Sequence, residues 1–274
     1  MPDAPIRSSV PQRSHGTVGL RMAAGGRLRD LHQQGCTKLF LPRTHAPVRE
    51  AVLVNTAGGL TGGDTLRAEV TLEPGAALTC TTQAAERIYR SAEGGAQVST
   101  QLSLGAGAAL AWLPQETILF DRSALHRRVH VEMAEDAELV LVEMLTLGRA
   151  AMGEHAISAR LDDGREIRRG GRRILHDVQR ATLPLPADAA LLGNATCLAT
   201  LMVIAPDAED RYAALHAALD ADGVEAAGSA WEGKLVVRCL SVAPHRLRQV
   251  LARALVALRR APLPRSWTHG GIAA

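Results

Sequence analysis

The chain has few aromatic side chains and almost no lysine. Two Phe, two Tyr and three Trp make up 3% of its 274 residues, so no aromatic platform for stacking nucleic-acid bases is expected. Lys38 and Lys234 are the only lysines among 31 basic residues, and 28 acidic residues leave a net charge of +3. Because the two signs are interspersed, no basic stripe indicates a nucleic-acid partner.

Paired cysteines are also lacking. The four cysteines, at positions 36, 80, 197 and 239, never occur with CxxC spacing, which argues against a zinc knuckle or a thioredoxin-like site. We therefore expect reduced, mostly buried thiols, as in a cytoplasmic protein.

Long apolar runs are missing as well. No stretch approaches the roughly 18 apolar residues of a membrane span, so no membrane association is expected. The first residues, MPDAPIRSSVPQRSHG, have no apolar segment typical of a secretory signal. Their prolines and polar residues predict a flexible tail over 1–14.

What is present from residue 48 to about 180 is a series of short apolar runs separated by Gly, Pro and Asp. Their alternation with period two, or their continuous apolar character, predicts strands, several of them buried between layers. The clearest are VREAVLVN (48–55), ALTCTT (77–82), QVSTQLSL (97–104), RRVHVEM (127–133) and AELVLVEML (137–145).

A weak repeat runs through this β-rich segment. Each copy places a small or charged turn between two aliphatic residues six positions apart, and successive copies start 32, 29 and 28 residues after one another. Such a period favours stacked, coil-like layers of strands. Ordinary hairpins with similar turns are the alternative. The copies are LEPGAAL (72–78), LGAGAAL (104–110), MAEDAEL (133–139) and LDDGREI (161–167).

The C-terminal quarter has helical periodicity. Residues 207–221 and 244–260 carry apolar faces with a 3.6-residue period and flank a strand over 234–242. We predict a mainly β (α+β) fold of stacked, coil-like sheet layers with about two C-terminal helices. A single domain over 15–274 is expected, with a β-rich body to about 180–200 and a strand–helix part over 197–274.

Common catalytic motifs are absent: there is no GxGxxG, GK[ST], GxSxG or HExxH. The segment AVLVNTAGGLTGGDTL (51–66) is glycine-rich, but a strand pattern follows it instead of a helix. Asp64 at this turn either points into a cleft or bonds to backbone amides. His126 and His130 lie on a strand pattern, where four residues span ~13 Å, too far for one ion.

Three glutamates stand out by their surroundings. Glu143 interrupts the apolar run LVLVEML, and because an unpaired buried carboxylate is costly, it either pairs with Arg149 or Arg87 or lines a polar channel. Glu86 adjoins Arg87 in TTQAAERIYRS, and Glu154 follows Gly153 within reach of Arg149.

Four ordered blocks together resemble the family of the urease accessory protein UreD, also called UreH. They are NTAGGLTGGD (55–64), TTQAAERIYRS (81–91), WLPQETILFDRS (112–123) and LVLVEMLTLGRAAMGE (139–154). The segments KLVVRCLS (234–241) and PRSWTH (264–269) are similar too, although Ser266 stands where an aliphatic residue is expected. The resemblance covers about residue 38 to the C-terminus.

The resemblance implies a chaperone for nickel insertion, not an enzyme. The expected partners are urease apoprotein, the accessory protein UreF and, through UreF, the GTPase UreG, in a hetero-oligomer. No His- or Cys-rich cluster is present, so no tightly bound cofactor is expected and any nickel would be transient, at weak oxygen sites.

For a nickel path the acidic candidates are Asp64 and Glu143, then Glu86 and Glu154. Candidate partner contacts are Arg127 and Arg128 on their strand and Arg265 and Trp267 near the C-terminus. Two alternatives remain open: a purely structural adaptor that conducts no nickel, and a hydrolase that uses Asp64 and Glu86, which would need both carboxylates in one pocket.

Overall fold

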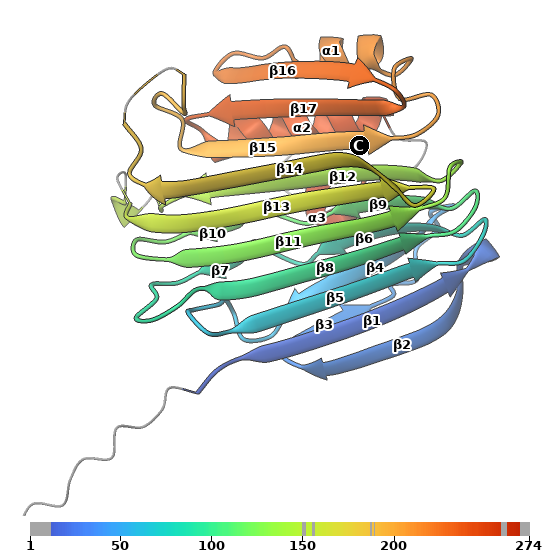
Figure 1. Ribbon diagram of the computed structural model, residues 1–274, viewed down its shortest axis with the longest axis horizontal. Helices are drawn as coiled ribbons and strands as arrows, with labels where there is room; N and C mark the ends of the chain where they lie inside the picture. Colours follow the sequence, from blue (N-terminus) through green and yellow to red (C-terminus); the bar gives the residue numbers. More distant parts are fainter. Residues whose placement is uncertain are drawn as a thin grey trace, which may run out of the picture.

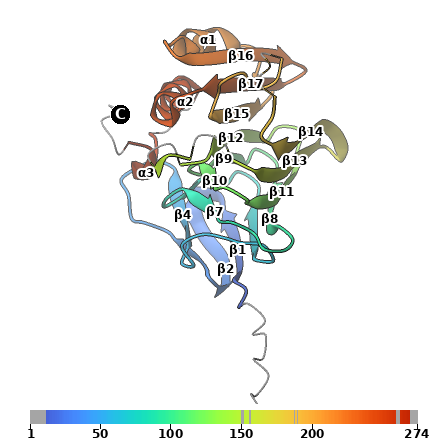
Figure 2. The same cartoon turned by 90° about the vertical axis from the view of Figure 1, so that its left-hand side faces the viewer.

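The computed structural model describes residues 12–149, 152–154, 157–186, 188, 190–258 and 262–268. Most of the predicted N-terminal tail, residues 1–11, lies outside the described residues. The strands form two large sheets that face each other (Figure 1; Figure 2). Sheet A consists, in spatial order, of β14 (Arg172–Leu183), β13 (Ala159–Arg169), β11 (Ala124–Met133), β8 (Ala96–Leu104), β5 (Thr65–Leu72), β1 (His15–Ala23) and β2 (Arg27–Gly35).

Sheet B faces sheet A across the core. In spatial order it contains β16 (Val224–Trp231), β17 (Lys234–Ser241), β15 (Cys197–Ile204), β12 (Glu138–Leu147), β9 (Ala109–Leu113), β6 (Ala77–Thr82), β4 (Arg49–Asn55) and β3 (Thr37–Phe40). Two short strands, β7 (Glu86–Ile88) and β10 (Thr117–Leu119), run parallel to the end of β12. They close a third side between the sheets.

The chain builds these sheets as a coil. It passes from β5 to β6, then through β7 to β8, and repeats the path through β9 and β10 to β11 and β12, so equivalent strands stack in parallel. The predicted stacked coil is therefore confirmed. The repeated segments 72–78, 104–110 and 133–139 each contain the tight turn from sheet A to sheet B.

The turn predicted for the fourth copy of the repeat is wrong. Residues 161–167 lie inside strand β13 and form no turn. The Asp-Asp-Gly letters suggest a turn, but Leu161 and Ile167 face the core and parallel pairing with β11 keeps the segment extended. Tertiary pairing overrides the local turn propensity.

The inner faces of the two sheets form the main apolar core. Because side chains alternate along a strand, Val129, Val131 and Met133 of β11 point inward and are almost fully buried. They join inward residues of sheet B such as Leu110 and Leu139. Three of the four cysteines are buried, and all four are free thiols.

The C-terminal part continues sheet B with antiparallel strands and covers its outer face with helices (Figure 2). The predicted helices are confirmed with shorter bounds: α1 covers Tyr212–Leu219 and α2 covers Pro244–Leu258, while a short α3 (Arg265–Thr268) was not predicted. The last two positions expected in the second helix, 259 and 260, lie outside the described residues. A 3-10 turn, η1 (Ala24–Gly26), links β1 to β2.

Candidate functional site

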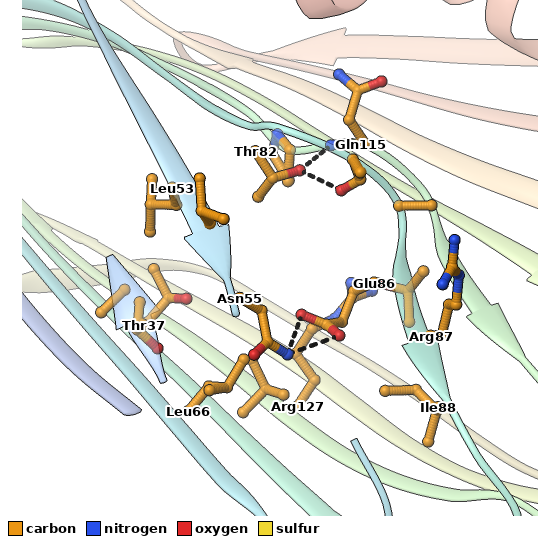
Figure 3. A pocket seen from close by; sticks show the side chains of 18 of the residues that line it. Thr37, Leu53, Asn55, Leu66, Thr82, Glu86, Arg87, Ile88, Gln115 and Arg127 are labelled. Atoms are coloured by element: carbon orange, nitrogen blue, oxygen red, sulfur yellow. Dashed lines mark hydrogen bonds between the residues drawn. The ribbon is translucent and has the colours of Figure 1, made fainter. Parts of the chain in front are cut away.

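A cavity of about 200 Å³ lies between the two sheets, beside the short strands β7 and β10 (Figure 3). Polar residues from several strands belong to its lining, among them Asn55 at the end of β4, Glu86 at the start of β7, Thr117 at the start of β10, and Arg127 and Glu143 from β11 and β12. The volume accommodates several water molecules. A cavity with charged and polar groups in a partly apolar lining thus lies inside the protein.

Glu86 is held in this cavity by Asn55. The Asn55 Nδ2 donates to both carboxylate oxygens, at 3.1 and 3.2 Å, as the dashed lines in Figure 3 show. Burial raises the pKa of Glu86 to about 7, although Asn55 and Arg87 act in the opposite direction. Among the residues that the structure describes, no cationic group lies within ion-pair distance of Glu86. It is therefore a cavity carboxylate without an arginine partner.

Glu143 has a different environment. It accepts a hydrogen bond from Arg165 Nε and lies 3.3 Å from Arg127 Nε. The prediction that Glu143 forms a buried ion pair is therefore confirmed. Its predicted partners, Arg149 or Arg87, are wrong, because Arg165 and Arg127 take that place. Glu143 both lines the cavity and belongs to an ionic cluster.

The ionic cluster contains three arginines and three carboxylates, so its formal charges balance. Arg165 is its centre: Nη2 lies 2.6 Å from Asp163 Oδ2 and Nη1 lies 3.0 Å from Asp177 Oδ2. Arg238 also binds Asp177. The members are Arg127, Glu143, Asp163, Arg165, Asp177 and Arg238. The cluster ties β11, β13 and β14 of sheet A to β12 and β17 of sheet B.

The charged forms in this cluster stabilise one another. Burial by itself would raise the pKa of Asp163, but Arg127 and Arg165 lower it below its ordinary value. Burial likewise opposes the charge on Arg127, yet Asp163 and Glu143 hold the pKa of the guanidinium above its ordinary value. Because every charge has a close counter-charge, removal of any one member would leave another charge uncompensated.

Asp64 does not line the cavity. Its two oxygens accept hydrogen bonds from the backbone amides of Ser14 and Thr61, both at 2.8 Å. The carboxylate is 4% exposed and closes the glycine-rich turn, which is the second of the two roles that the turn pattern left open. The prediction that Asp64 lines an interior path is corrected, because the turn uses both oxygens.

Glu154 lies outside the cavity and pairs with Arg149. The Arg149 guanidinium holds the pKa of Glu154 below its ordinary value, so the ion pair expected from the sequence is present. The two carboxylates proposed for a hydrolase, Asp64 and Glu86, do not share the cavity lining.

Of the four predicted partner contacts, two side chains are interior. Arg127 is 6% exposed and belongs to the ionic cluster, and Trp267 is 1% exposed; both are corrected as surface contacts. Arg128, on the opposite face of β11, points outward and pairs with Asp162 at 2.7 Å. Arg265 is exposed on α3. The prediction that Arg128 and Arg265 contact a partner stays a prediction.

Trp267 anchors the C-terminal segment beside the cavity wall. Its indole N–H donates to the Leu113 carbonyl oxygen at 2.9 Å, and the Arg248 guanidinium lies 4.9 Å from its ring centroid. Ser266 shares hydrogen bonds with Thr81 at 3.0 Å and with Gln115 at 3.3 Å. The hydroxyl of Ser266 thus has polar partners at this position.

In the described part of the chain, no three His, Cys, Asp or Glu side chains are grouped so as to hold a metal ion. His126 and His130 both lie on β11, as their alternation predicted, and both are exposed. No helix among the described residues is long and apolar enough to cross a membrane.

Two stacked sheets around an internal cavity and a buried ionic cluster define a β-solenoid-like protein with a partly charged interior. Comparison with known families identifies it further. Residues 14–268 match the family model of the UreD urease accessory protein, and the chain belongs to this family. The resemblance carried by the four sequence blocks is thereby confirmed.

Individual relatives support the assignment over nearly the full chain. The urease accessory protein UreD of Dinoroseobacter shibae is 48% identical over 261 residues, covering 93% of this chain and 92% of the relative. The UreD proteins of Cereibacter sphaeroides and Rhizobium leguminosarum bv. trifolii are 46% and 42% identical, covering 93% and 94% of this chain and 94% and 96% of the relatives. The family role is an accessory one in urease maturation.

Proposed function

We propose that this chain is a chaperone that bridges urease apoprotein to UreF and the GTPase UreG, and that its cavity forms part of the path by which nickel reaches urease. The observation that carries the nickel path is Glu86, an acidic side chain that lies in a cavity large enough for several waters and forms no ion pair with any residue that the structure describes. A divalent cation would bind such a carboxylate well, because the positive charge of the ion stabilises the ionised form of the carboxyl group.

The chemistry of the lining suits transfer better than storage. The described residues of the cavity lining include no histidine or cysteine, and beside Glu86 the polar groups are the Asn55 amide, which turns its Nδ2 donor to the carboxylate, and the Thr117 hydroxyl, which accepts from Arg127. Oxygen ligands of this kind hold a cation more weakly than thiolates or imidazoles do. An ion that keeps several of its waters fits the volume. Weak ligands let the ion leave again.

Glu143 is a poorer ligand because Arg165 and Arg127 already neutralise it. Its role is to hold the two sheets together at the inner end of the cavity. A purely structural adaptor, the alternative function, would depend on this cluster and on the surfaces of the chain but would not need Glu86.

The test compares Glu86→Gln with Glu132→Gln in urease activated in the presence of all accessory proteins. Glu86→Gln keeps the shape and the Asn55 contact but removes the negative charge, so we expect urease with several-fold less nickel while the complex still assembles. Glu132→Gln, which changes an exposed ion pair with Arg168 away from the cavity, should leave the nickel content unchanged. Full nickel loading with Glu86→Gln would support the adaptor instead.

A further inference from the structure

An exposed aromatic cluster lies next to the cavity. The rings of Tyr89 and Phe120 meet edge to face, with centroids 4.9 Å apart and an interplanar angle of 86°. The Arg149 guanidinium covers the Phe120 ring at 4.2 Å from its centroid. Tyr89 is 37% exposed and nearby Met152 is 71% exposed. In a chain with so few aromatics, half of the Phe and Tyr side chains thus meet in this aromatic cluster.

A glycine turn fixes the Tyr89 ring. Tyr89 Oη donates to the Gly58 carbonyl oxygen at 3.1 Å. Gly59 has a φ of +149°, and a Cβ there would lie 2.3 Å from Tyr89 Cε2 and 2.8 Å from the Arg87 carbonyl oxygen. Only glycine lets the ring pack this closely on the turn. The cluster is therefore built into the fold.

Four separate segments of the sequence converge at this point. The turn comes from 55–64, Tyr89 from 81–91, Phe120 from 112–123 and Arg149 from 139–154, the four blocks singled out in the sequence. The turn also places the cluster at the cavity, because Gly58, Arg87 and Ile88 belong to the cavity lining.

Two exposed arginines lie beside the aromatic cluster. Arg87 and Arg90 flank Tyr89 and are exposed, and neither forms an ion pair with any residue described in the structure. Arg149 pairs with Glu154 and Arg122 with Asp121, while Glu86 next to Arg87 and the exposed Glu93 form no ion pair with the described residues. Exposed Tyr, Met and Arg side chains, here next to the half-buried Phe120, are typical of the centres of protein–protein interfaces. Free arginines favour a partner that carries carboxylates.

We propose that the aromatic cluster, together with Arg87 and Arg90, is the surface on which urease apoprotein docks, through an acidic segment that also presents an apolar side chain. The inference deepens the proposed function and rests on it, because urease is the partner that the family assignment names. Docking here would bring the acceptor of the metal next to the cavity, whose lining includes Glu86 and Arg87.

The test measures binding of purified urease apoprotein to the coexpressed complex of this chain with UreF, without nickel and at two salt concentrations. Arg87→Glu with Arg90→Glu should weaken binding by about tenfold or more at low salt and reduce its salt dependence. The matched control is Arg27→Glu with Arg172→Glu, two exposed arginines on β2 and β14. The control should bind within about twofold of the unchanged chain.

A second variant, Tyr89→Ala, tests the aromatic part and should also weaken binding while UreF stays associated. Equal effects of the two arginine pairs, no effect of either pair, or loss of UreF instead of urease would each overturn the docking site. Glu86→Gln should bind urease normally, so a failed docking site and a failed nickel path give different results. If the unchanged complex binds no urease apoprotein, the proposed bridging of urease to UreF and UreG is contradicted.

Discussion

Arg127 and Asp163 face each other from the neighbouring parallel strands β11 and β13 and form a bidentate ion pair in the protein interior. Their nitrogen–oxygen distances are 2.8 and 2.7 Å. The pair joins two turns of the coil and is part of the buried ionic cluster, with Glu143 and Arg165 as further partners. Its loss should therefore affect stability before it affects recognition.

The first prediction compares two adjacent arginines. Arg127→Met removes one charge from a balanced, buried cluster and should lower the free energy of unfolding by about 3 kcal/mol. Arg128→Met removes a partly exposed pair with Asp162 and should cost less than about 1 kcal/mol. Urea denaturation of both variants in the UreF complex measures the difference. Equal losses in the free energy of unfolding would show that the buried ion pair contributes no more to stability than the partly exposed one.

Much of this cluster could be predicted from strand alternation. In ALHRRVHVEM the apolar residues Leu125, Val129 and Val131 share a face with Arg127, so Arg127 had to point inward and Arg128 outward. In LDDGREI the same rule places Asp163 and Arg165 inward between Leu161 and Ile167. The interpretation of that segment as a turn hid this signal.

Other contacts could not be predicted from local sequence. Glu143 meets Arg165 across the space between the two sheets, and this depends on how the coil stacks. Trp267 reaches the Leu113 carbonyl 154 positions away. The repeat and the helical periods identified the layers because those patterns are local, whereas pairings between layers follow from the assembled fold.

The second prediction concerns the glycine turn. Gly59→Ala places a Cβ against the Tyr89 ring and the Arg87 carbonyl oxygen and should destabilise by about 2 kcal/mol or more. Gly58→Ala is the matched control: its φ is +75°, but nothing lies within 4 Å of the added carbon, so only backbone strain of about 1 kcal/mol is expected. Thermal unfolding with tyrosine fluorescence follows both. A larger loss for Gly58→Ala would contradict the close packing at Gly59.

The third prediction concerns two tryptophans of different exposure. Trp267→Ala removes a side chain that is 1% exposed, together with its hydrogen bond, and should cost about 4 kcal/mol. Trp231 is 42% exposed and loses only a contact with Lys234, so Trp231→Ala should cost about 1 kcal/mol or less. Chemical denaturation measures both. Similar small losses would show that the C-terminal segment is not anchored at β9.

The last prediction is a pH dependence of stability that arises from Glu86. Burial raises the pKa of this carboxyl from 4.5 to about 7 in the folded chain, so between these values the folded state holds a proton that the unfolded state has lost. The free energy of unfolding therefore falls as the pH rises from 4.5 to 7, by something on the order of 2 kcal/mol, and then levels off. Glu86→Gln lacks this titrating proton and should be more stable than the unchanged chain above pH 7.

The control is Glu69→Gln, on the outer face of sheet A and paired with Arg67. It should follow the pH profile of the unchanged chain. Denaturation curves from pH 5 to 8 measure the free energy of unfolding of all three chains. Parallel pH profiles for the unchanged chain and Glu86→Gln would contradict the prediction, because they would mean that water reaches the carboxylate freely and that burial in the cavity does not raise its pKa.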